Sequence, residues 1–484
     1  MRLDEYAAYD GLGLADLVAA GDVTPGELAR LAAEAIATLD PELKAVVEVY
    51  DDRIQDLDET ALGDGPFRGV PFLIKDVGGH EKGRKIEYGS RLCEGMVAEF
   101  DTNFGKLLRA AGLNILGRSN TPEYSIAGSA ENALYGNTST PWRLGHSAGG
   151  SSGGAAAAVA AGLVPLAHGS DIAGSIRIPA CWCGGVGLKP SRGLISAGPV
   201  LDESGFGLAM SFVQSKTVRD TAAMLDCLAV PQPGDPFIVR RPETPYAQAL
   251  TERPRGLKVA WTAEPLAKHP VDREIAAATE ACALQLEQLG HAVEEAKLPF
   301  DHEEASRAMA HFWFFGFHQR LEGYAAKTGR TIGPDTLEPV VLEIYNLSRR
   351  MDPYQFLTSL DWLNRARRTL GAFFTEYDVL VSPSCAIPAP PHGPYGLSEP
   401  GWDPVDYIVH GDKPVQYSFP FNVTGGPAIS LPLAMHSTGL PIGVQLAGGP
   451  SDDHILLGLA AELEDALPWA QRRPPLHVAA AHPT

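Results

Sequence analysis

Short apolar segments that resemble strands alternate with helical segments along almost the whole chain, and this alternation constrains the fold more than any other feature. Strand patterns occur at residues 44–50, 69–77, 114–117, 163–168, 257–261, 379–382, 429–433 and 442–446. Helical patterns occur at residues 25–40 (ending before Pro41), 104–111, 154–161, 217–228, 271–289 and 452–466. Such alternation predicts an α/β fold in which helices cover a central mixed or parallel sheet.

The chain has 484 residues, a length that would ordinarily suggest about three domains. No internal repeat and no linker-like segment interrupts the alternation, however. We therefore predict one domain over residues 1–484. Within it we expect a core at about residues 65–220 and a helical insertion at about residues 230–375.

The charge balance excludes several classes of partner. The chain has 39 basic and 59 acidic residues, a net charge of −20, and no long basic run. A surface of this sign repels phosphate backbones and anionic lipids. We therefore expect no nucleic-acid partner and no membrane association. The longest apolar stretch, residues 155–167, is too short to span a bilayer.

The termini and cysteines favour a cytoplasmic protein. The N-terminus is acidic and lacks the apolar region of a secretory signal. The six cysteines are scattered, which is not typical of a disulfide framework. Cys181 and Cys183 form a C-x-C pair without the further ligands of a zinc site. We expect a reducing compartment and no bound metal.

One serine motif suggests an esterase. Residues 145–149 read GHSAG and match the G-x-S-x-G nucleophile elbow of α/β-hydrolases, with Ser147 at its centre. That elbow needs a hydrophobic strand directly before it. Residues 137–144 read instead as a loop that contains Pro141. An esterase that uses Ser147 is therefore the alternative to the function developed next.

A second serine region matches a known family over several motifs. Residues 149–154 read GGSSGG, residues 170–180 read SDIAGSIRIPA, and residues 69–76 read GVPFLIKD. Residues 377–383, 421–428 and 439–445 continue the match. In these motifs the chain resembles the amidase signature family, and the separation of Ser151 from Ser175 also fits. The resemblance covers nearly the whole chain and implies that family's fold, a twisted mixed sheet with helices on both faces.

The resemblance implies a catalytic triad in which Ser175 is the nucleophile, Ser151 is a bridging serine and Lys75 is the base. A serine hydroxyl is a poor nucleophile without a base within hydrogen-bond reach. Lysine titrates near 10.4 in water and must be desolvated to act as that base. The apolar strand residues 72–74 would supply this desolvation. The expected reaction is amide hydrolysis through an acyl-enzyme, which needs no cofactor.

The same resemblance assigns roles to the backbone around the serines. It implies a cis peptide between Gly150 and Ser151. Backbone N–H groups of Ile172, Ala173, Gly174 and Ser175 would form the oxyanion hole, where each donor typically contributes 10²–10³-fold. Ala173 stands where the family usually has glycine. We expect Asp171 and Arg177 to hold this loop in place rather than to catalyse.

Two less regular segments are the candidates for substrate binding. Ser125, Ile126 and Ala127 are expected to pass beside the nucleophile and to form a largely apolar wall. Phe314 and Phe315 belong to an aromatic cluster at residues 311–318. Such a cluster on a helix is either helix core or an apolar lining for the substrate.

Within the family, residues 167–175 and 466–474 are most similar to the bacterial enzymes that open 6-aminohexanoate cyclic dimer. This implies small, uncharged, non-peptidic amides as substrates, with cyclic amides, aryl amides and carbamates (urethanase activity) included, and is compatible with a homodimer. A tRNA-dependent amidotransferase subunit is disfavoured because Ile178 follows Arg177, where that role has glutamine, and by the net charge of −20. A non-catalytic binding protein is disfavoured by the intact Lys75, Ser151 and Ser175.

Overall fold

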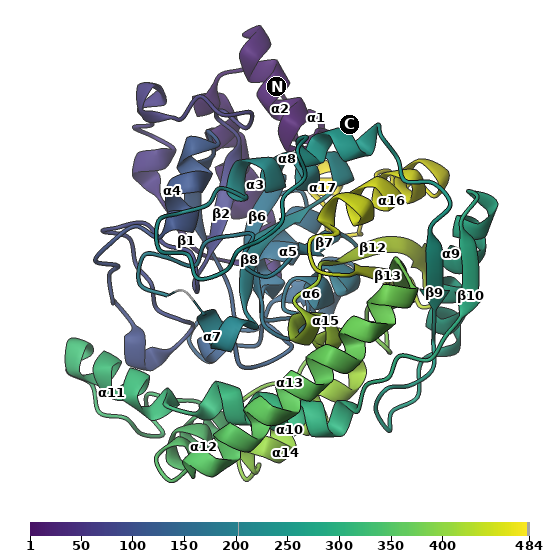
Figure 1. The fold of residues 1–484 in the computed structure, drawn as a ribbon. Coiled ribbons are helices and arrows are strands. Elements are labelled where there is room, and N and C mark those ends of the chain that lie inside the picture. The colour runs from purple at the N-terminus through teal and green to yellow at the C-terminus, as the bar shows by residue number, and fades with distance from the viewer. Residues whose placement is uncertain (202, 482–484) are drawn as a thin grey trace.

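The computed structural model describes residues 1–201 and 203–481, and an eleven-stranded sheet runs through its centre (Figure 1). The strand order is β1-β3-β2-β6-β8-β7-β12-β13-β11-β9-β10. The strands are β1 Val46–Val49, β2 Pro71–Lys75, β3 Asn114–Ser119, β6 Leu166–Asp171, β7 Val186–Lys189, β8 Met210–Ser215, β9 Lys258–Trp261, β10 Ala292–Glu295, β11 Val379–Pro383, β12 Ala428–Met435 and β13 Pro441–Gly448. A separate small sheet pairs β4 Ser139–Thr140 with β5 Arg143–Ser147.

The sheet is mixed, as predicted. Strand β2 is parallel to both β3 and β6, and β9 is parallel to β10 and β11. The remaining pairs in this sheet are antiparallel. Parallel strands bring their carboxyl ends to one edge of a sheet. The ends of β2 and β6, and with them Lys75 and Asp171, therefore lie close together.

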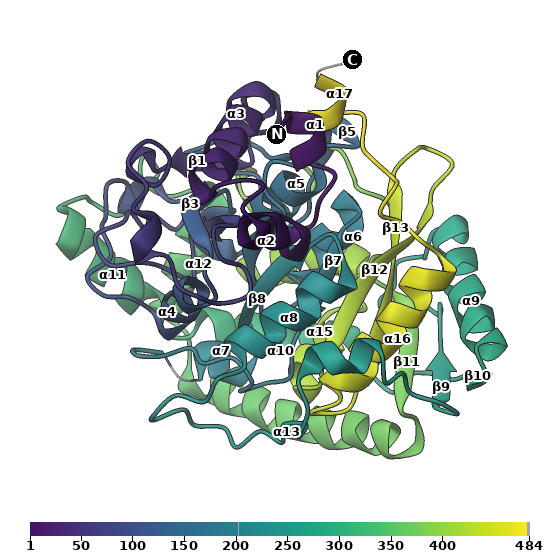
Figure 2. The ribbon, with the colours of Figure 1, turned by 90° about the horizontal axis from the view of Figure 1, so that it is seen from above.

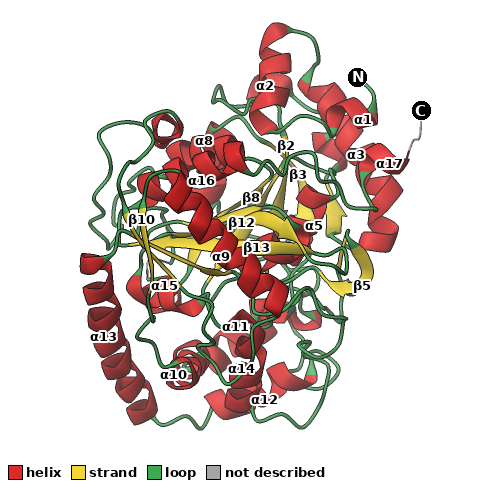
Figure 3. Ribbon diagram, turned by 90° about the vertical axis from the view of Figure 1, so that its right-hand side faces the viewer, coloured by secondary structure: helices red, strands yellow, loops and turns green. Residues whose placement is uncertain are grey.

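Helices cover both faces of this sheet (Figures 1 and 3). The α-helices are α1 Leu3–Tyr6, α2 Gly11–Ala20, α3 Pro25–Leu43, α4 Asn103–Ala110, α5 Gly153–Ala160, α6 Arg177–Cys183, α7 Ser204–Gly207, α8 Val218–Leu228, α9 Arg273–Gln288, α10 His302–Phe314, α11 Phe317–Thr328, α12 Pro339–Ser348, α13 Pro353–Glu376, α14 Pro404–Asp412, α15 Phe419–Thr424, α16 Asp453–Ala466 and α17 Val478–Ala481. Short 3₁₀ helices are η1 Asp51–Arg53, η2 Glu59–Ala61, η3 Arg91–Cys93, η4 Glu123–Ser125, η5 Tyr246–Leu250 and η6 Lys413–Val415. No helix in the described ranges is long and apolar enough to cross a membrane.

Two expectations from the sequence need correction. Helix α3 does not stop before Pro41 but continues to Leu43. Pro41 has no N–H to donate, but Leu43 is fully buried and the Asp40 carboxylate accepts the N–H groups of Ala45 and Val46, so packing and capping hold the last turn. The segment at about residues 230–375 supplies two strands to the sheet: β9, where a strand was predicted at residues 257–261, and β10, which was not predicted.

Two hydrophobic cores flank the loops that follow β2, β3 and β6. The larger core packs α3, α5, α8 and α16 against the sheet. The second core is built by α10 to α14, which form a separate helical layer beneath the sheet in Figure 1, and α13 runs along the outside of that layer in Figure 2. Tyr124, Ile126 and Ala127 belong to this second core. The loops that carry the candidate catalytic residues therefore lie where the helical layer meets the sheet.

Candidate active site

Lys75 is the last residue of β2, and its side chain is completely buried. Its Nζ atom lies within hydrogen-bond distance of three serine hydroxyls: 2.7 Å from Ser151 Oγ, 3.0 Å from Ser152 Oγ and 2.9 Å from Ser170 Oγ. A neutral amine has two N–H donors and one lone pair. Three hydroxyl partners can serve either form: all three accept from the ammonium group, or two accept from the neutral amine while the third donates to its lone pair.

The surroundings of Lys75 favour its neutral form. Burial lowers the pKa of Lys75 to about 7, and the charge of Asp171 opposes this shift. Its backbone N–H donates to Nδ1 of His168, 3.2 Å away. Burial first, and then the charge of Lys75, lower the pKa of His168 well below its usual range. The lysine thus has a neutral imidazole beside it and can serve as a proton acceptor near neutral pH.

Ser151 and Ser152 stand in the tight turn that leads into α5. The Gly150–Ser151 peptide is cis, as the resemblance implied. The turn requires glycine before Ser151, because a Cβ atom on Gly150 would lie 2.6 Å from the backbone of Ser129. The third hydroxyl partner, Ser170, comes from β6, and its backbone N–H donates to Ser152 Oγ at 3.1 Å.

Ser175 lies in the loop between β6 and α6, which a buried ion pair holds in place. Arg177 donates to both carboxylate oxygens of Asp171, at 3.0 and 2.9 Å. Arg177 also donates to the side chains of Gln445 and Asn422, at 2.8 and 2.7 Å. All of these groups are buried, so their hydrogen bonds are worth more than at the surface. The contacts agree with the positioning role expected for Asp171 and Arg177.

One of the four backbone N–H groups predicted to form the oxyanion hole has a partner within the protein. The N–H of Gly174 donates to Asp171 Oδ1 at 2.8 Å and is therefore engaged within the protein. Gly174 has φ 123° and a Cβ atom there would lie 2.6 Å from Ser418, so the bend needs glycine for its shape. Ile172, Ala173 and Ser175 are left as the candidate donors, since no acceptor within the described residues takes their N–H groups.

A cavity of about 560 Å³ opens beside these loops; we call it the main cavity. Both Ser151 and Ser175 line it, although they are only 1% and 7% exposed. Ser170 and Ser125 also line it. Aromatic side chains form much of the rest of the wall, which includes Tyr124, Phe206, Phe312, Trp313 and Phe315. Glu203 and Arg320 also line it, so the cavity suits a small ligand with an apolar body and a few polar groups.

Ile126 and Ala127 line a smaller neighbouring cavity of about 30 Å³, the side cavity, rather than the main cavity. Ser175 and Trp313 line both, so the two cavities meet at the candidate nucleophile. Asp412 also faces the side cavity, and burial raises its pKa to about 7. One of its carboxylate oxygens has no hydrogen-bond partner within the described residues.

Phe314 was predicted to bind the substrate, but the structure places it elsewhere. Its side chain is completely buried in the core of the helical layer and does not line the main cavity, whereas Phe315 does. Helix α10 ends between the two: Phe315 has extended backbone angles, φ −62° and ψ 119°. That change of backbone direction sends adjacent side chains to different environments. Phe312 and Trp313, from the same predicted aromatic cluster, join Phe315 in the wall.

Comparison with known proteins agrees with this geometry. The family model described as Amidase matches residues 27–457, which is most of the chain. The chain belongs to the Amidase family. The enzyme class expected from the sequence, a hydrolase of carbon–nitrogen bonds in amides, is thereby confirmed.

Two curated relatives and one solved structure are similar to this amidase over nearly its whole length. The 6-aminohexanoate-cyclic-dimer hydrolase of Paenarthrobacter ureafaciens is 35% identical, with 96% of each chain covered. An acylamidase of Rhodococcus erythropolis is 33% identical, over 95% of this chain and 96% of that one. The structure of a 6-aminohexanoate cyclic dimer hydrolase complexed with substrate superimposes with a TM-score of 0.91 at 34% identity, covering 97% of this chain and 99% of that chain. The expected resemblance and fold are confirmed.

The alternative nucleophile, Ser147, is placed differently in this amidase. It ends β5 of the small sheet, is 1% exposed, and accepts a hydrogen bond from the N–H of Gly149 at 3.1 Å. It lines neither the main nor the side cavity. The G-x-S-x-G match is therefore part of a hairpin and not of a nucleophile elbow.

Sequence reasoning missed four residues that surround the candidate triad. Ser152 and Ser170 contact Lys75 Nζ, His168 contacts its backbone, and Asp412 lies across the side cavity from Ser175. Ser152 and Ser170 were within the quoted motifs, and their neighbours Ser151 and Asp171 were singled out. Only Asp412, on α14, had no local signal in the sequence.

Proposed function

We propose that this amidase hydrolyses small, uncharged, non-peptidic amides through a Lys75–Ser151–Ser175 triad and an acyl-enzyme. The observation on which the proposal rests is the buried amine of Lys75, 2.7 Å from the Oγ of Ser151, which lines the same cavity as Ser175. A lysine that is neutral near pH 7 and hydrogen-bonded to a serine is an activated base. The family and its relatives support the reaction class.

The proposed reaction has two halves. Ser175 Oγ attacks the amide carbonyl while its proton passes through Ser151 to Lys75 Nζ. The developing oxyanion accepts hydrogen bonds from N–H groups of the loop at residues 172–175. Lys75 then returns the proton through Ser151 to the leaving amine, and the carbon–nitrogen bond breaks. Water hydrolyses the ester on Ser175 by the same route and releases a carboxylate.

The substrate class follows from the main cavity. Its aromatic wall, with Phe312, Trp313 and Phe315, suits apolar acyl or amine groups, and its volume of about 560 Å³ suits a compact molecule. The relatives named as a cyclic-dimer hydrolase and an acylamidase support cyclic amides and acylamides, and we include aryl amides because of the aromatic wall. Carbamates need the same acyl transfer, so we include them in the proposed class. A cytoplasmic homodimer without cofactor stays a prediction.

The test is to label the purified protein with a fluorophosphonate and to map the modified residue by mass spectrometry. We expect the label on Ser175, none in Ser175→Ala, and labelling slowed by about 10²–10⁴-fold in Lys75→Ala, which is the usual contribution of a general base. Ser147→Ala is the matched control and should label as the wild type does. Label on Ser147, or equal labelling of Lys75→Ala, would refute the triad.

A panel of anilides, a cyclic amide and an aryl carbamate then tests the substrate class. Turnover of anilides and the cyclic amide by wild-type protein, and none by Ser175→Ala, is expected. If anilides are cleaved and the carbamate is not, the urethanase part of the proposal fails while the amidase part stands.

A further inference from the structure

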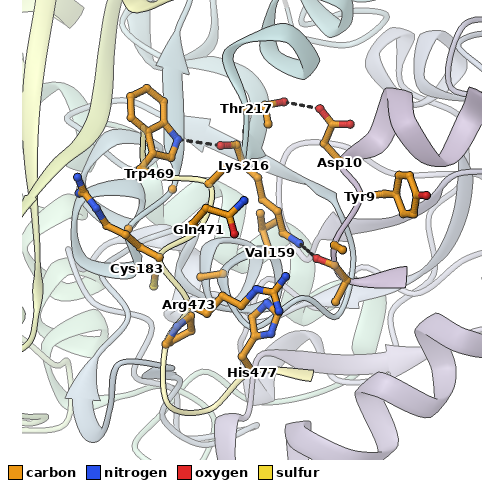
Figure 4. Close-up of a pocket in the computed structure, with 18 of the residues that line it drawn as sticks. Tyr9, Asp10, Val159, Cys183, Lys216, Thr217, Trp469, Gln471, Arg473 and His477 are labelled. Carbon is orange, nitrogen blue, oxygen red and sulfur yellow. Dashed lines mark hydrogen bonds between the residues drawn. The ribbon is translucent and has the colours of Figure 1, made fainter. Parts of the chain in front are cut away.

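A second cavity, of about 600 Å³, lies away from the candidate active site, and we call it the basic cavity (Figure 4). It is bounded by the chain between α1 and α2, by the turn between β8 and α8, and by the segment at residues 469–477. Its remaining wall is the carboxyl ends of α5 and α6, near Val159 and Cys183. Ser151 and Ser175 precede the other ends of these helices, so the basic cavity is separate from the main cavity.

Three basic side chains from two distant parts of the chain meet in this cavity: Lys216, Arg473 and His477, all labelled in Figure 4. His477 is buried, Lys216 is half-buried and Arg473 is exposed at the mouth. Burial and the neighbouring positive charges lower the pKa values of Lys216 and His477. Burial, and then the charge of Arg473, lower the pKa of Lys216 to about 8, while the charges of Asp220 and Asp10 act in the opposite direction. Burial, Lys216 and Arg473 lower the pKa of His477 to about 3. At neutral pH the cluster therefore holds two positive charges and a neutral imidazole.

The hydrogen-bond donors of this cluster are largely unused. Lys216 Nζ donates once, to the carbonyl oxygen of Ala7 at 3.2 Å, although an ammonium group has three N–H donors. His477 Nδ1 accepts from the N–H of Ala479, which leaves the proton of the neutral ring on Nε2. Within the described residues, neither that Nε2 nor the guanidinium of Arg473 has a hydrogen-bond acceptor or ion-pair partner.

The carboxylate that lines the cavity does not neutralise the cluster. Asp10 accepts hydrogen bonds from Thr217 Oγ1 at 2.9 Å and from Arg219 Nε at 2.6 Å. It is therefore already paired with Arg219, outside the cluster. Asp220, whose charge also acts on Lys216, accepts hydrogen bonds from the backbone N–H groups of Gly11 and Leu12. Positive groups whose nearest carboxylates are bonded to other donors can bind an anion.

Apolar walls adjoin these donors. Trp469 and Trp142 line the cavity, and their indole N–H groups donate to the backbone oxygens of Lys216 and Cys183, at 3.0 and 2.8 Å. The ring carbons, together with Val159, are left as apolar lining. The carboxyl ends of α5 and α6 carry partial negative charge, which disfavours a dianion such as phosphate. A ligand with a single negative charge and an apolar body fits both features.

We propose that the basic cavity binds a small organic carboxylate, with its head group on Lys216, Arg473 and His477 and its apolar body against Trp469. The contacts expected are charge-assisted hydrogen bonds from two or three donors to the carboxylate oxygens. Nothing in this assignment depends on the catalytic triad, so it stands or fails separately from the proposed function.

Isothermal titration calorimetry with sodium hexanoate tests the proposal on the full-length protein. We expect one hexanoate per chain, at least tenfold weaker binding in Lys216→Met, and three- to tenfold weaker binding in Arg473→Gln. The control is Arg350→Gln, at an exposed arginine in the loop after α12, which should bind hexanoate within twofold of the wild type. Thermal melting of each variant checks that it is folded. Both cavity variants are measured so that, if one fails to fold, the other still tests the proposal.

Two further probes define the ligand class. Hexylamine, with the same apolar body and the opposite charge, should not bind, and inorganic phosphate should bind at least tenfold more weakly than hexanoate. The proposal is overturned if wild-type protein takes up no hexanoate, or if Lys216→Met and Arg473→Gln both bind it as the wild type does, since the hexanoate would then occupy the main cavity. Phosphate binding tighter than hexanoate would overturn the carboxylate class.

Discussion

At the scale of single residues, burial alone does not make Lys75 a candidate base. Lys189 is buried as completely, and burial lowers its pKa to about 7 as well. Its Nζ, however, donates to the backbone oxygen of Pro190, at 2.8 Å. Lys75 instead meets three hydroxyls, one of which, Ser151, lines the main cavity beside Ser175. The hydroxyl partners of Lys75, one of which lines the main cavity, distinguish the two lysines.

The lowered pKa of Lys75 predicts how activity depends on pH. Only the neutral amine accepts a proton, so kcat/KM for an anilide should rise about tenfold per pH unit up to about pH 7 and level off above pH 8. Steady-state rates between pH 5.5 and 9 measure this. Asp412→Asn is the control, because that carboxyl also titrates near pH 7 beside Ser175. A flat profile, or one that disappears in Asp412→Asn, would contradict the assignment to Lys75.

We expect the hydroxyl of Ser170 to affect the midpoint of this pH profile, which is the apparent pKa of Lys75. Its hydroxyl lies 2.9 Å from Lys75 Nζ and partly solvates the ammonium form. Hydrogen bonds to a charged group contribute about 1.5–3 kcal/mol, so Ser170→Ala should shift the midpoint of the profile down by about one to two pH units. The same pH series on the variant measures it. An unchanged midpoint would show that the hydroxyl does not stabilise the charged lysine.

At the scale of elements, the end of α10 decides which aromatic residues can meet a substrate. The helix ends at Phe314, and the extended backbone of Phe315 turns its ring to stack on Phe356, with ring centroids 4.5 Å apart. Phe314 remains in the core of the helical layer. Adjacent residues of the same type therefore have different roles, and they form a matched pair for mutation.

Phe315→Ala should raise KM for anilides by roughly 5- to 100-fold, because one apolar wall of the main cavity is lost, at about 1–3 kcal/mol. The free energy of unfolding of Phe315→Ala should differ little from that of the wild type. Phe314→Ala should instead lower the free energy of unfolding by about 3–5 kcal/mol, with KM nearly unchanged. Kinetics and urea denaturation of both variants separate the effects. The reverse pattern would mean that the two rings are wrongly assigned.

At the scale of the whole molecule, burying Lys75 lowers the stability of the fold at neutral pH. Lys75 ends a buried strand and its amine lies among the serines of the loop after β5 and of β6, so it is removed from water completely. A group whose pKa is lowered on folding destabilises the folded state at every pH below its unfolded value. The candidate base is therefore retained at a cost in stability, a common feature of active sites.

Lys75→Met should accordingly stabilise the protein at pH 7 by on the order of a few kcal/mol, while it abolishes activity. Between about pH 7 and 10.5 the unfolded chain holds a proton that folded Lys75 does not, so wild-type stability rises with pH relative to the variant. The advantage of Lys75→Met should shrink as the pH rises from 7 to 9.5. Urea denaturation at both values measures it, and a difference independent of pH would contradict the lowered pKa.

The sequence alone predicted the α/β class, eight of the eleven strands of the central sheet, six of the longer helices and the amidase family, and it singled out Lys75, Ser151 and Ser175, but it missed β7, β8 and β10. These features depend on local periodicity and on contiguous motifs, which can be read from the sequence without knowing how distant segments pack. Even so, local rules placed the end of α3 too early, since they weigh the missing N–H of Pro41 but not the burial of Leu43.

The tertiary structure decided what each side chain meets. It brought Ser170 to Lys75 Nζ, engaged the N–H of Gly174 with Asp171, and placed Phe315 rather than Phe314 in the cavity wall. It also brought Lys216 and Arg473, far apart in the sequence, to one cavity. The physical reason is that side-chain direction and burial depend on packing between distant segments, and no local pattern in the chain records that packing.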